Sequence, residues 1–307
     1  MNCLLAVVGP TGTGKTSLAV SIAQKFNGEI IGADSRQVYR YMDIGTAKPS
    51  FVELATVPHH IIDIILPNHD FSLAQYQELA NKAIKDIQSR NRLPLLVGGT
   101  GQYIWGVIEG WEIPRVEPDL QYRQEMERRA ETGENLYKKL TDIDPEAAVK
   151  IDPRNVRRVI RALEVYHRAG ERFSWLKRKK SLAYNTLVIG LTAERSELYC
   201  RIDSRVDDMI NNGLVAEVED LLTKGYDFTR PAMSGIGYRQ IGMYLRNEIS
   251  LEEAVKQVKT ETHRFVRHQY NWFKLKDERI HWFDVSKDIE GRVTSLISEF
   301  MGICKTG

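Results

Sequence analysis

The segment Gly9-Pro-Thr-Gly-Thr-Gly-Lys-Thr16 constrains the fold of this 307-residue chain more than any other feature. It matches the pattern G-x-x-x-x-G-K-[ST] and directly follows a short apolar run, Cys3–Val8. A loop of this kind joins a buried strand to a helix, and its backbone N–H groups surround phosphate oxygens. Lys15 adds a positive charge, and the hydroxyl of Thr16 can bind Mg²⁺. The predicted phosphate-binding residues are Gly9, Pro10, Thr11, Gly12, Thr13, Gly14, Lys15 and Thr16.

Apolar runs bounded by turn residues alternate with helical patterns along the chain. Helical periodicity is found, for example, at Lys15–Phe26 and Leu73–Gln88. The expected strands are Cys3–Val8, Glu29–Ala33, Ile61–Ile65, Leu93–Val97, Leu187–Leu191 and Ile280–Phe283. Continuous apolar runs suit strands buried on both faces, as in a parallel sheet. We therefore expect an α/β fold with a P-loop NTPase-like core, in which helices flank a parallel sheet.

Residues from about Trp111 to Tyr184 interrupt this alternation with helical patterns alone. The expected helices are Asp119–Glu131, Leu136–Asp142, Pro145–Lys150 and Pro153–Arg168. Asp152 before Pro153 suggests an acidic N-cap followed by proline at the first helical position. We expect an all-helical insertion at 112–185 between two parts of the core, 1–111 and 186–307. The second part should carry long helices at Glu197–Lys224 and Leu251–Lys274.

Two features argue against an ordinary nucleoside triphosphatase. The run Leu93–Val97 ends in Gly98-Gly99, without the Asp that would hold a metal as a Walker-B residue. The pair Asn81-Lys82 lacks the Asp of a guanine-reading motif. The loop thus predicts phosphate binding without specifying a triphosphate.

Polar residues follow two of the expected strands, at the sheet edge where ligands of α/β proteins bind. One group is Asp34-Ser35-Arg36-Gln37, and the other is Thr100 within Gly98–Gly101. Asp34 could act as a general base or bind a metal through water, or it could simply cap the next turn. Ser35 and Gln37 offer neutral hydrogen bonds to the edge of a base. Arg201 and Arg205 lie one helical turn apart, and either could neutralise a leaving diphosphate or lie solvated at the surface.

Positive charge is concentrated in residues 150–180. This stretch has eleven Lys or Arg against three acids, a net charge of +8 in a chain whose total is +2. Arg154, Arg157, Arg158 and Arg161 share one face of the expected helix, and Tyr166, Phe173 and Trp175 are interleaved. A basic stripe with aromatics is typical of nucleic-acid binding, although a solvated helix or a contact to an acidic protein would look similar. A second patch, Arg264–His268, precedes further aromatic residues.

Cysteine, histidine and hydropathy patterns exclude several other classes. Cys3, Cys200 and Cys304 are far apart and suit a reducing compartment, and His59-His60 form no zinc pattern. No apolar run is long enough to cross a bilayer, and the N-terminal run lacks the features of a signal peptide. We expect a cytoplasmic enzyme.

Several long segments together resemble the bacterial tRNA dimethylallyltransferases, also called tRNA isopentenyltransferases. They span nearly the whole chain, from Leu5 to about Phe283. The segments are GPTGTGKT, ADSRQVYRYMDIGTAKP (Ala33–Pro49), GGTGQY (Gly98–Tyr103), RVIRALEVY (Arg158–Tyr166), RIDSRVDDMINNGLVAEV (Arg201–Val218) and GIGYRQ (Gly235–Gln240). Gly12-Thr13 stand where the family often has Ala-Ser, which leaves the phosphate grip intact.

The resemblance implies transfer of a dimethylallyl group from dimethylallyl diphosphate to the N6 amine of an adenosine. That adenosine lies 3′-adjacent to the anticodon in tRNAs reading codons that begin with U. The implied catalytic residues are Asp34 as the base, Thr16, Arg205 and Thr100, with Mg²⁺ held through Thr16. The implied tRNA contacts are Asp34, Ser35, Arg36, Gln37, Thr100, Arg123, Val159, Ile160, Arg161, Ala162, Leu163, Gly235, Ile236, Gly237, Tyr238, Arg239 and Gln240. The expected partners are the tRNA anticodon stem-loop and the diphosphate donor, bound by a monomer.

Three other functions are compatible with parts of the sequence. A P-loop kinase of a nucleoside or other small metabolite could use Asp34 as its base, but it leaves the basic insertion unexplained. An isopentenyltransferase acting on free adenine nucleotides would need neither the insertion nor the GIGYRQ segment. A non-catalytic RNA-binding module would need neither Asp34 nor the arginines.

Overall fold

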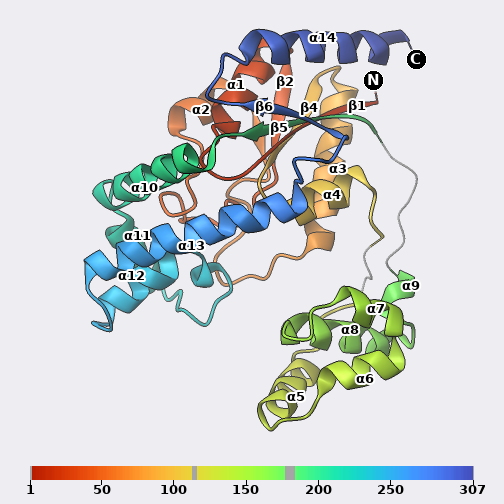
Figure 1. Ribbon diagram of the computed structural model, residues 1–307, viewed down its shortest axis with the longest axis vertical. Helices are drawn as coiled ribbons and strands as arrows, with labels where there is room; N and C mark the ends of the chain where they lie inside the picture. The colour runs from red at the N-terminus through yellow and green to blue at the C-terminus, as the bar shows by residue number, and fades with distance from the viewer. Residues whose placement is uncertain (1, 113–115, 177–183, 307) are drawn as a thin grey trace. The chain divides into compact units, whose positions relative to one another are not determined.

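A computed structural model describes residues 2–112, 116–176 and 184–306. The chain forms two compact units (Figure 1). The first unit combines Met1–Ile108 with Tyr184–Gly307, and the second comprises Glu109–Ala183. The sequence predicts the corresponding boundaries at 112 and 185.

A parallel sheet of six strands forms the centre of the first unit, in the order β3-β2-β4-β1-β5-β6. The strands are β1 (Cys3–Val8), β2 (Gly28–Gly32), β3 (His59–His60), β4 (Leu93–Gly98), β5 (Asn185–Thr192) and β6 (Ile280–Asp284). Every residue of β1 is buried, which explains why its sequence is a continuous apolar run. The sheet confirms the predicted P-loop NTPase-like α/β fold.

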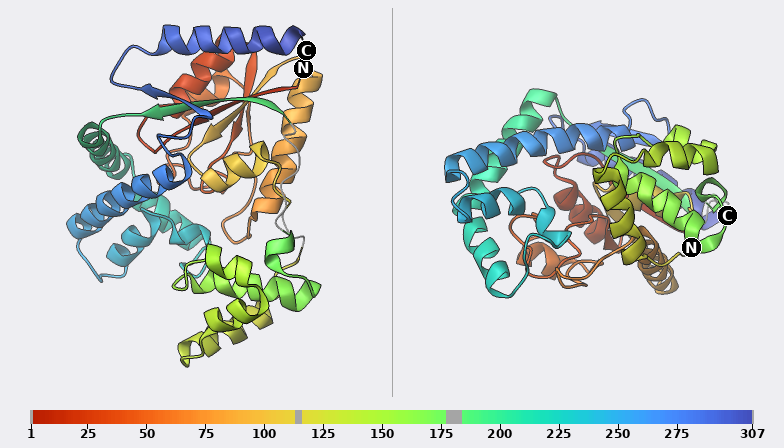
Figure 2. Two further views of the ribbon diagram at one scale, coloured as in Figure 1. Left: turned by 45° about the vertical axis from the view of Figure 1, so that its right-hand side comes forward. Right: turned by 90° about the horizontal axis from the view of Figure 1, so that it is seen from below.

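Helices cover both faces of this sheet. Helices α1 (Lys15–Lys25) and α14 (Glu290–Thr306) pack on one face, where Ile22 and Ile297 join the core of Leu5 and Leu95 (Figure 2). Helices α3 (Leu73–Ser89) and α4 (Gly101–Ile108) contact β4 and each other. The remaining helices of this unit are α2 (Phe51–Thr56), α10 (Arg195–Asn211), α11 (Leu214–Thr223), the short 3₁₀ helix η1 (Ala232–Ser234), α12 (Tyr238–Leu245) and α13 (Leu251–Trp272).

Two predicted elements of the first unit are wrong in extent. The strand expected at Ile61–Ile65 is instead the two-residue β3, because Ile61 and Asp63 have positive φ values of 62° and 56° that break an extended chain. The helix expected at Glu197–Lys224 is two helices, α10 and α11. Gly213 separates them with a φ of 97°, a conformation that favours glycine.

The second unit contains five helices in its described residues, 109–112 and 116–176: α5 (Leu120–Glu131), α6 (Leu136–Ile143), α7 (Pro145–Lys150), α8 (Val156–Ala169) and α9 (Phe173–Leu176). Their core includes Met126, Leu140 and Leu163. Helix α8 begins three residues later than predicted, because Asn155 is its N-cap and accepts a hydrogen bond from the Arg158 backbone N–H. In the described part of the chain, no helix is sufficiently long and apolar to cross a membrane.

Candidate active site

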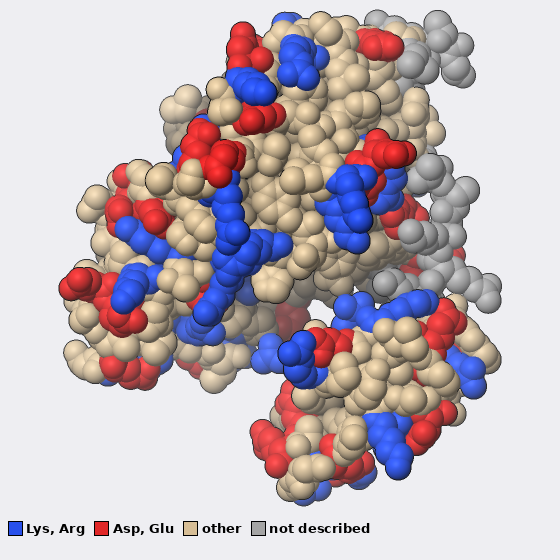
Figure 3. All heavy atoms as spheres, in the orientation of Figure 1, with Lys and Arg blue, Asp and Glu red and all other residues tan. Residues whose placement is uncertain are grey.

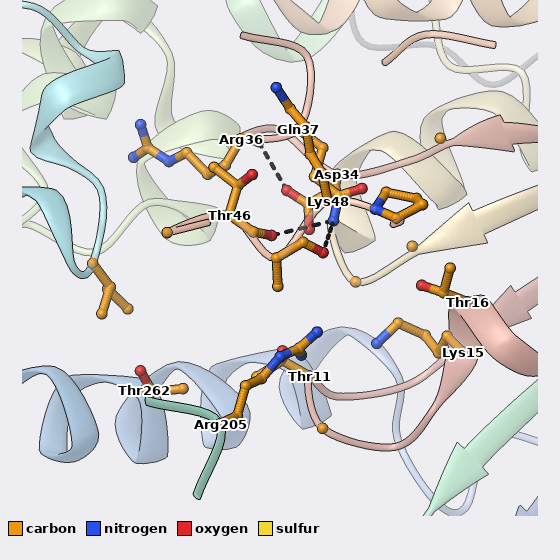
Figure 4. A pocket seen from close by; sticks show the side chains of 18 of the residues that line it. Thr11, Lys15, Thr16, Asp34, Arg36, Gln37, Thr46, Lys48, Arg205 and Thr262 are labelled. Carbon is orange, nitrogen blue, oxygen red and sulfur yellow. Dashed lines mark hydrogen bonds between the residues drawn. The ribbon is translucent and has the colours of Figure 1, made fainter. Parts of the chain in front are cut away.

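A cavity of about 460 Å³ opens at the carboxyl ends of the central strands in the first unit (Figure 4). Its lining includes the phosphate loop, the segment after β2, residues 45–49, the end of β4, residues 234–237, and parts of helices α10 and α13. In Figure 4, Lys15 and Arg205 approach this space from one side, and Asp34 lies across from them. The topology therefore gathers the phosphate loop with Lys15, Arg205 and the Asp34 carboxylate around one cavity.

Glycines give the phosphate loop its shape. Gly9, Gly12 and Gly14 have φ values of 138°, 86° and 78°, which side chains with a Cβ rarely adopt. Gly14 is the N-cap of α1 and supplies no side-chain cap, so the first N–H groups of the helix remain available to an anion. The hydroxyl of Thr13 donates a hydrogen bond to the Pro10 carbonyl at 2.9 Å and fixes the loop from within.

Burial disfavours the charged forms of Lys15 and Arg205, two of the cations that line the cavity. Burial lowers the pKa of Lys15 to about 8, the charge of Asp34 opposes this shift, and Arg205 adds to it. Burial also lowers the pKa of Arg205. The Lys15 ammonium donates a hydrogen bond to the Pro10 carbonyl at 2.7 Å, which holds the lysine side chain against the phosphate loop. A bound anion would relieve both desolvation penalties.

The structure separates the two candidate arginines. Arg205 lines the cavity, and its guanidinium donates a hydrogen bond to the Thr11 hydroxyl at 3.2 Å. Arg201, one turn earlier on α10, pairs with Glu197 at 2.5 Å and does not line the cavity. Of these two, Arg205 is the one placed to contact a diphosphate.

Asp34 and its neighbours form a loop held at several points. One carboxylate oxygen of Asp34 accepts a hydrogen bond from the Arg36 backbone N–H at 2.8 Å. The Thr100 hydroxyl accepts one from the Ser35 backbone N–H at 3.0 Å. The Arg36 guanidinium donates to the Pro231 carbonyl at 2.7 Å, and the Gln37 amide donates to the Ala47 carbonyl at 3.0 Å. The predicted residues of this loop are thus brought together beside the phosphate loop.

The segment Gly235–Gln240 reaches the cavity through only part of its length. Ile236 and Gly237 line it, and Arg239 is exposed. Tyr238 is 1% exposed and Gln240 is fully buried, with its amide oxygen accepting a hydrogen bond from the Gly237 backbone N–H. The side chains of Tyr238 and Gln240 are thus packed inside the protein, and the contact of this segment with tRNA stays a prediction.

A carboxylate missed by the sequence reasoning supports the cavity wall. Glu217 of α11 accepts hydrogen bonds from the backbone N–H groups of Asp43, Ile44 and Gly45 at 2.8, 2.7 and 3.1 Å. It also accepts one from the Tyr238 hydroxyl at 2.6 Å. Because residues 45–47 line the cavity, Glu217 fixes that wall from behind.

Lys48 is a second residue of the cavity wall that the sequence patterns do not identify. Its side chain is 4% exposed and bonds Asp43 at 2.6 Å, Asp63, and the Tyr39 carbonyl at 2.7 Å. The wall on this side is thus tied to three neighbouring parts of the chain. No local pattern marks Glu217, because the loop N–H groups that it binds are about 170 positions away in sequence. The partners of Lys48 are nearer, but their spacing matches no regular helix or strand.

The predicted contact segment of the second unit is largely buried. The side chains of Val159, Ile160, Ala162 and Leu163 form part of its hydrophobic core, and the contact of this segment with tRNA stays a prediction. Arg161 and Arg123 are half-buried and both bind the buried carboxylate of Glu164. The exposed residues of the predicted basic face are Arg154, Arg157 and Arg158. The predicted basic residues Lys177, Arg178, Lys179 and Lys180 lie outside the described residues.

The second basic patch is exposed in the first unit. Arg264 and Arg267 on α13 and Arg195 on α10 are exposed, and Figure 3 shows Lys and Arg side chains gathered in a band over these helices. The Arg195 and Arg267 guanidinium groups both donate to the Tyr199 hydroxyl, at 3.1 and 3.0 Å. This band is available to an anionic partner.

The donor set of the cavity suits a hard cation. The Thr16 hydroxyl and the Asp34 carboxylate both line it, and oxygen is the ligand that Mg²⁺ prefers. Among the described residues, no group of three or more His, Cys, Asp or Glu side chains could enclose a metal. A site with few protein ligands fits an ion that is held largely by substrate phosphate oxygens.

The sequence matches one enzyme family along most of its length. The model of the IPP transferase family matches residues 37–276. The tRNA dimethylallyltransferase of Roseiflexus sp. (strain RS-1) is 52% identical over 300 residues, covering 97% of this chain and 98% of the relative. That of Dehalococcoides mccartyi is 47% identical, covering 97% and 92% of the two chains.

Solved structures agree with this match. A full-length tRNA isopentenylpyrophosphate transferase from Bacillus halodurans superposes with a TM-score of 0.73 at 41% identity, covering 98% of this chain and 96% of that one. A eukaryotic dimethylallyltransferase acting on tRNA gives a TM-score of 0.82 at 26% identity, covering 98% and 80%. The sequence and the fold together show that the chain belongs to the tRNA dimethylallyltransferase family of enzymes.

Proposed function

We propose that this enzyme transfers a dimethylallyl group from dimethylallyl diphosphate to the N6 amine of an adenosine in tRNA and releases diphosphate. The acceptor is the adenosine 3′-adjacent to the anticodon in tRNAs that read codons beginning with U. The observation that carries the proposal is the cavity itself, in which the phosphate loop and Arg205 lie across from Asp34. One side suits an anionic leaving group, and the other suits an amine that must lose a proton.

The donor side has the groups that an allylic diphosphate needs. The bond between the allylic carbon and the diphosphate oxygen breaks, and its electron pair leaves with the diphosphate. Lys15, Arg205 and the loop N–H groups stabilise the negative charge that develops on that oxygen. Mg²⁺, held through the Thr16 hydroxyl, would supply further neutralisation of the diphosphate charge.

The acceptor side has a carboxylate at the position of a base. As the allylic carbon bonds to N6, the amine gives up one proton, and Asp34 takes it. The backbone hydrogen bond from Arg36 orients the Asp34 carboxylate. Ser35 and Gln37 line the cavity and offer polar groups to the adenine edge once the base has left the stacked loop, and the Thr100 hydroxyl holds the Ser35 backbone from behind.

The enzyme also needs a surface for the tRNA backbone. Exposed arginines on α8 of the second unit and on α10 and α13 of the first unit supply positive charge for phosphate contacts. The enzyme acts as a monomer, which sedimentation of the free protein and of its RNA complex tests directly.

Transfer of labelled dimethylallyl diphosphate tests the proposal. The acceptors are an anticodon stem-loop with the adenosine, the same RNA with guanosine at that position, AMP and ATP. Label should enter only the first RNA, and Asp34→Asn should lower the rate by about 10²- to 10⁴-fold. Label in AMP would indicate a free-nucleotide enzyme. Consumption of γ-phosphate from ATP without any alkyl transfer would indicate a kinase.

A further inference from the structure

Gln269 of α13 lines the cavity and bridges two neighbouring loops there, the phosphate loop after β1 and the loop after β4. Its side chain is 4% exposed. The amide oxygen accepts a hydrogen bond from the Thr11 backbone N–H of the phosphate loop at 2.9 Å. The amide nitrogen donates one to the Gly99 carbonyl at 3.1 Å. A Cβ on Gly99 would lie 2.1 Å from that nitrogen, so the loop packs directly on the amide.

The bridge continues from Gly99 to the loop that carries Asp34. Thr100 follows Gly99, and its backbone N–H donates to the Ala33 carbonyl at 3.2 Å. The Thr100 hydroxyl accepts a hydrogen bond from the Ser35 backbone N–H at 3.0 Å. Asp34 lies between these two contacts. An unbroken series of hydrogen bonds and short chain segments therefore links the phosphate loop to Asp34 through Gln269.

We propose that Gln269 is a positioning residue that sets the separation between the diphosphate donor and the acceptor amine. This inference rests on the proposed function. It assigns to Gln269 no contact with the reacting atoms, only control of where the two loops hold them.

The chemistry of the bridge requires a side-chain amide. One end must accept from an N–H group, and the other must donate to a carbonyl. Gln269→Glu would set a carboxylate oxygen against the Gly99 carbonyl, and Gln269→Met would keep the length of the side chain but lose both hydrogen bonds. Either change frees the loops to shift relative to one another.

Such a shift should affect the transfer step more than binding. Each substrate is held mainly by its own loop, so its affinity should change little. Transfer requires the allylic carbon and N6 to lie about 3–3.5 Å apart, and a misplacement of about 1 Å can lower a rate by about 10²-fold. Water, which needs no such placement, should still capture the allylic carbon and give dimethylallyl alcohol.

The experiment compares wild type, Gln269→Met and Gln269→Glu in single turnovers with saturating dimethylallyl diphosphate and anticodon stem-loop. A matched control is Gln257→Met, since Gln257 lies on the same helix, bonds Glu253 at 3.1 Å and does not line the cavity. Transfer by wild type establishes the proposed function independently of the variants. The readouts are the transfer rate, both dissociation constants, and the ratio of dimethylallyl alcohol to modified RNA.

We expect the Gln269 variants to transfer about 10²-fold more slowly, with both dissociation constants within about threefold of wild type and a raised alcohol ratio. A merely unstable variant would leave that ratio unchanged, because unfolded enzyme carries out neither reaction. An unchanged transfer rate or an unchanged ratio would overturn the inference. A loss explained by weaker binding of either substrate would overturn it too, because Gln269 would then be a binding residue.

Discussion

Replacing Arg205 by glutamine should separate catalysis from stability. Arg205 is one of the two cations whose pKa is lowered by burial beside the phosphate loop, and none of the described carboxylates forms an ion pair with it. Loss of one such preorganised donor to a developing anion costs about 2.7–4 kcal/mol, so the transfer rate should fall by about 10²- to 10³-fold. The free protein should lose little stability, since the variant removes a desolvated charge that Asp34 and Glu53 attract without forming an ion pair with it.

Arg201→Gln is the matched control for this experiment. Arg201 does not line the cavity, so the rate should change by less than about threefold. Its partly exposed pair with Glu197 on the same helix is worth about 0.3–0.5 kcal/mol, so stability should change little as well. Thr11→Val tests a second route, because it removes the hydroxyl that Arg205 contacts and keeps the guanidinium. The transfer rate of Thr11→Val should fall by about tenfold at most. The assay is single-turnover transfer to the stem-loop with thermal unfolding alongside. Equal effects of Arg205→Gln and Arg201→Gln would refute the assignment.

Three other outcomes can be checked in the same preparations. Because burial lowers the pKa of Lys15 to about 8, donor affinity measured by calorimetry should weaken as pH rises above about 8, and a constant affinity to pH 9.5 would contradict this role. Hydrogen bonds led by that from Arg90 lower the pKa of Glu29 from 4.5 to about 2, so this carboxylate should contribute about 3 kcal/mol of stability above pH 4.5 that is lost as pH falls toward 2. In urea titrations, the free energy of unfolding of Glu29→Gln should fall less steeply with acid than that of wild type. Equally steep falls would contradict this contribution of Glu29. Glu217→Ala should lower the free energy of unfolding by about 2–4 kcal/mol and slow transfer, because it leaves the Tyr238 hydroxyl and several loop N–H groups without their acceptor; an unchanged unfolding midpoint would exclude this support.

Local chemistry explains which parts of the fold could be predicted. The phosphate loop and the buried strands follow from short patterns, and β1 has the predicted bounds, Cys3–Val8. An acidic N-cap followed by proline does start a helix at Asp144-Pro145. There the Asp144 carboxylate accepts a hydrogen bond from the Ala147 backbone N–H at 3.0 Å. The same pattern fails at Asp152, whose carboxylate instead binds the backbone N–H and the guanidinium of Arg154. The Asp-Pro dipeptide thus adopts two different local structures, and tertiary packing decides which one forms.

The parts of the site that could not be predicted depend on contacts between distant residues. Gln269 meets Thr11 across 258 positions in sequence, and no spacing rule signals such a pair. Helical periodicity placed Arg201 and Arg205 on one helix, but only the packed structure shows which of them lines the cavity. The resemblance identified Val159–Leu163 as a contact segment, whereas the apolar side chains there fill a core. Chemical type can be read from a sequence more readily than the direction in which a side chain faces.

The hydrogen bonds of Glu217 have a consequence for anion selectivity. Three successive backbone N–H groups, those of Asp43, Ile44 and Gly45, form a nest of the kind that binds phosphate. The protein fills this nest with its own tethered carboxylate, which competes at a very high effective concentration. A free phosphate or nucleotide can therefore hardly displace it. Of these two groups of backbone N–H donors in the described residues, Glu217 occupies one, and the phosphate loop is the one left open to a diphosphate.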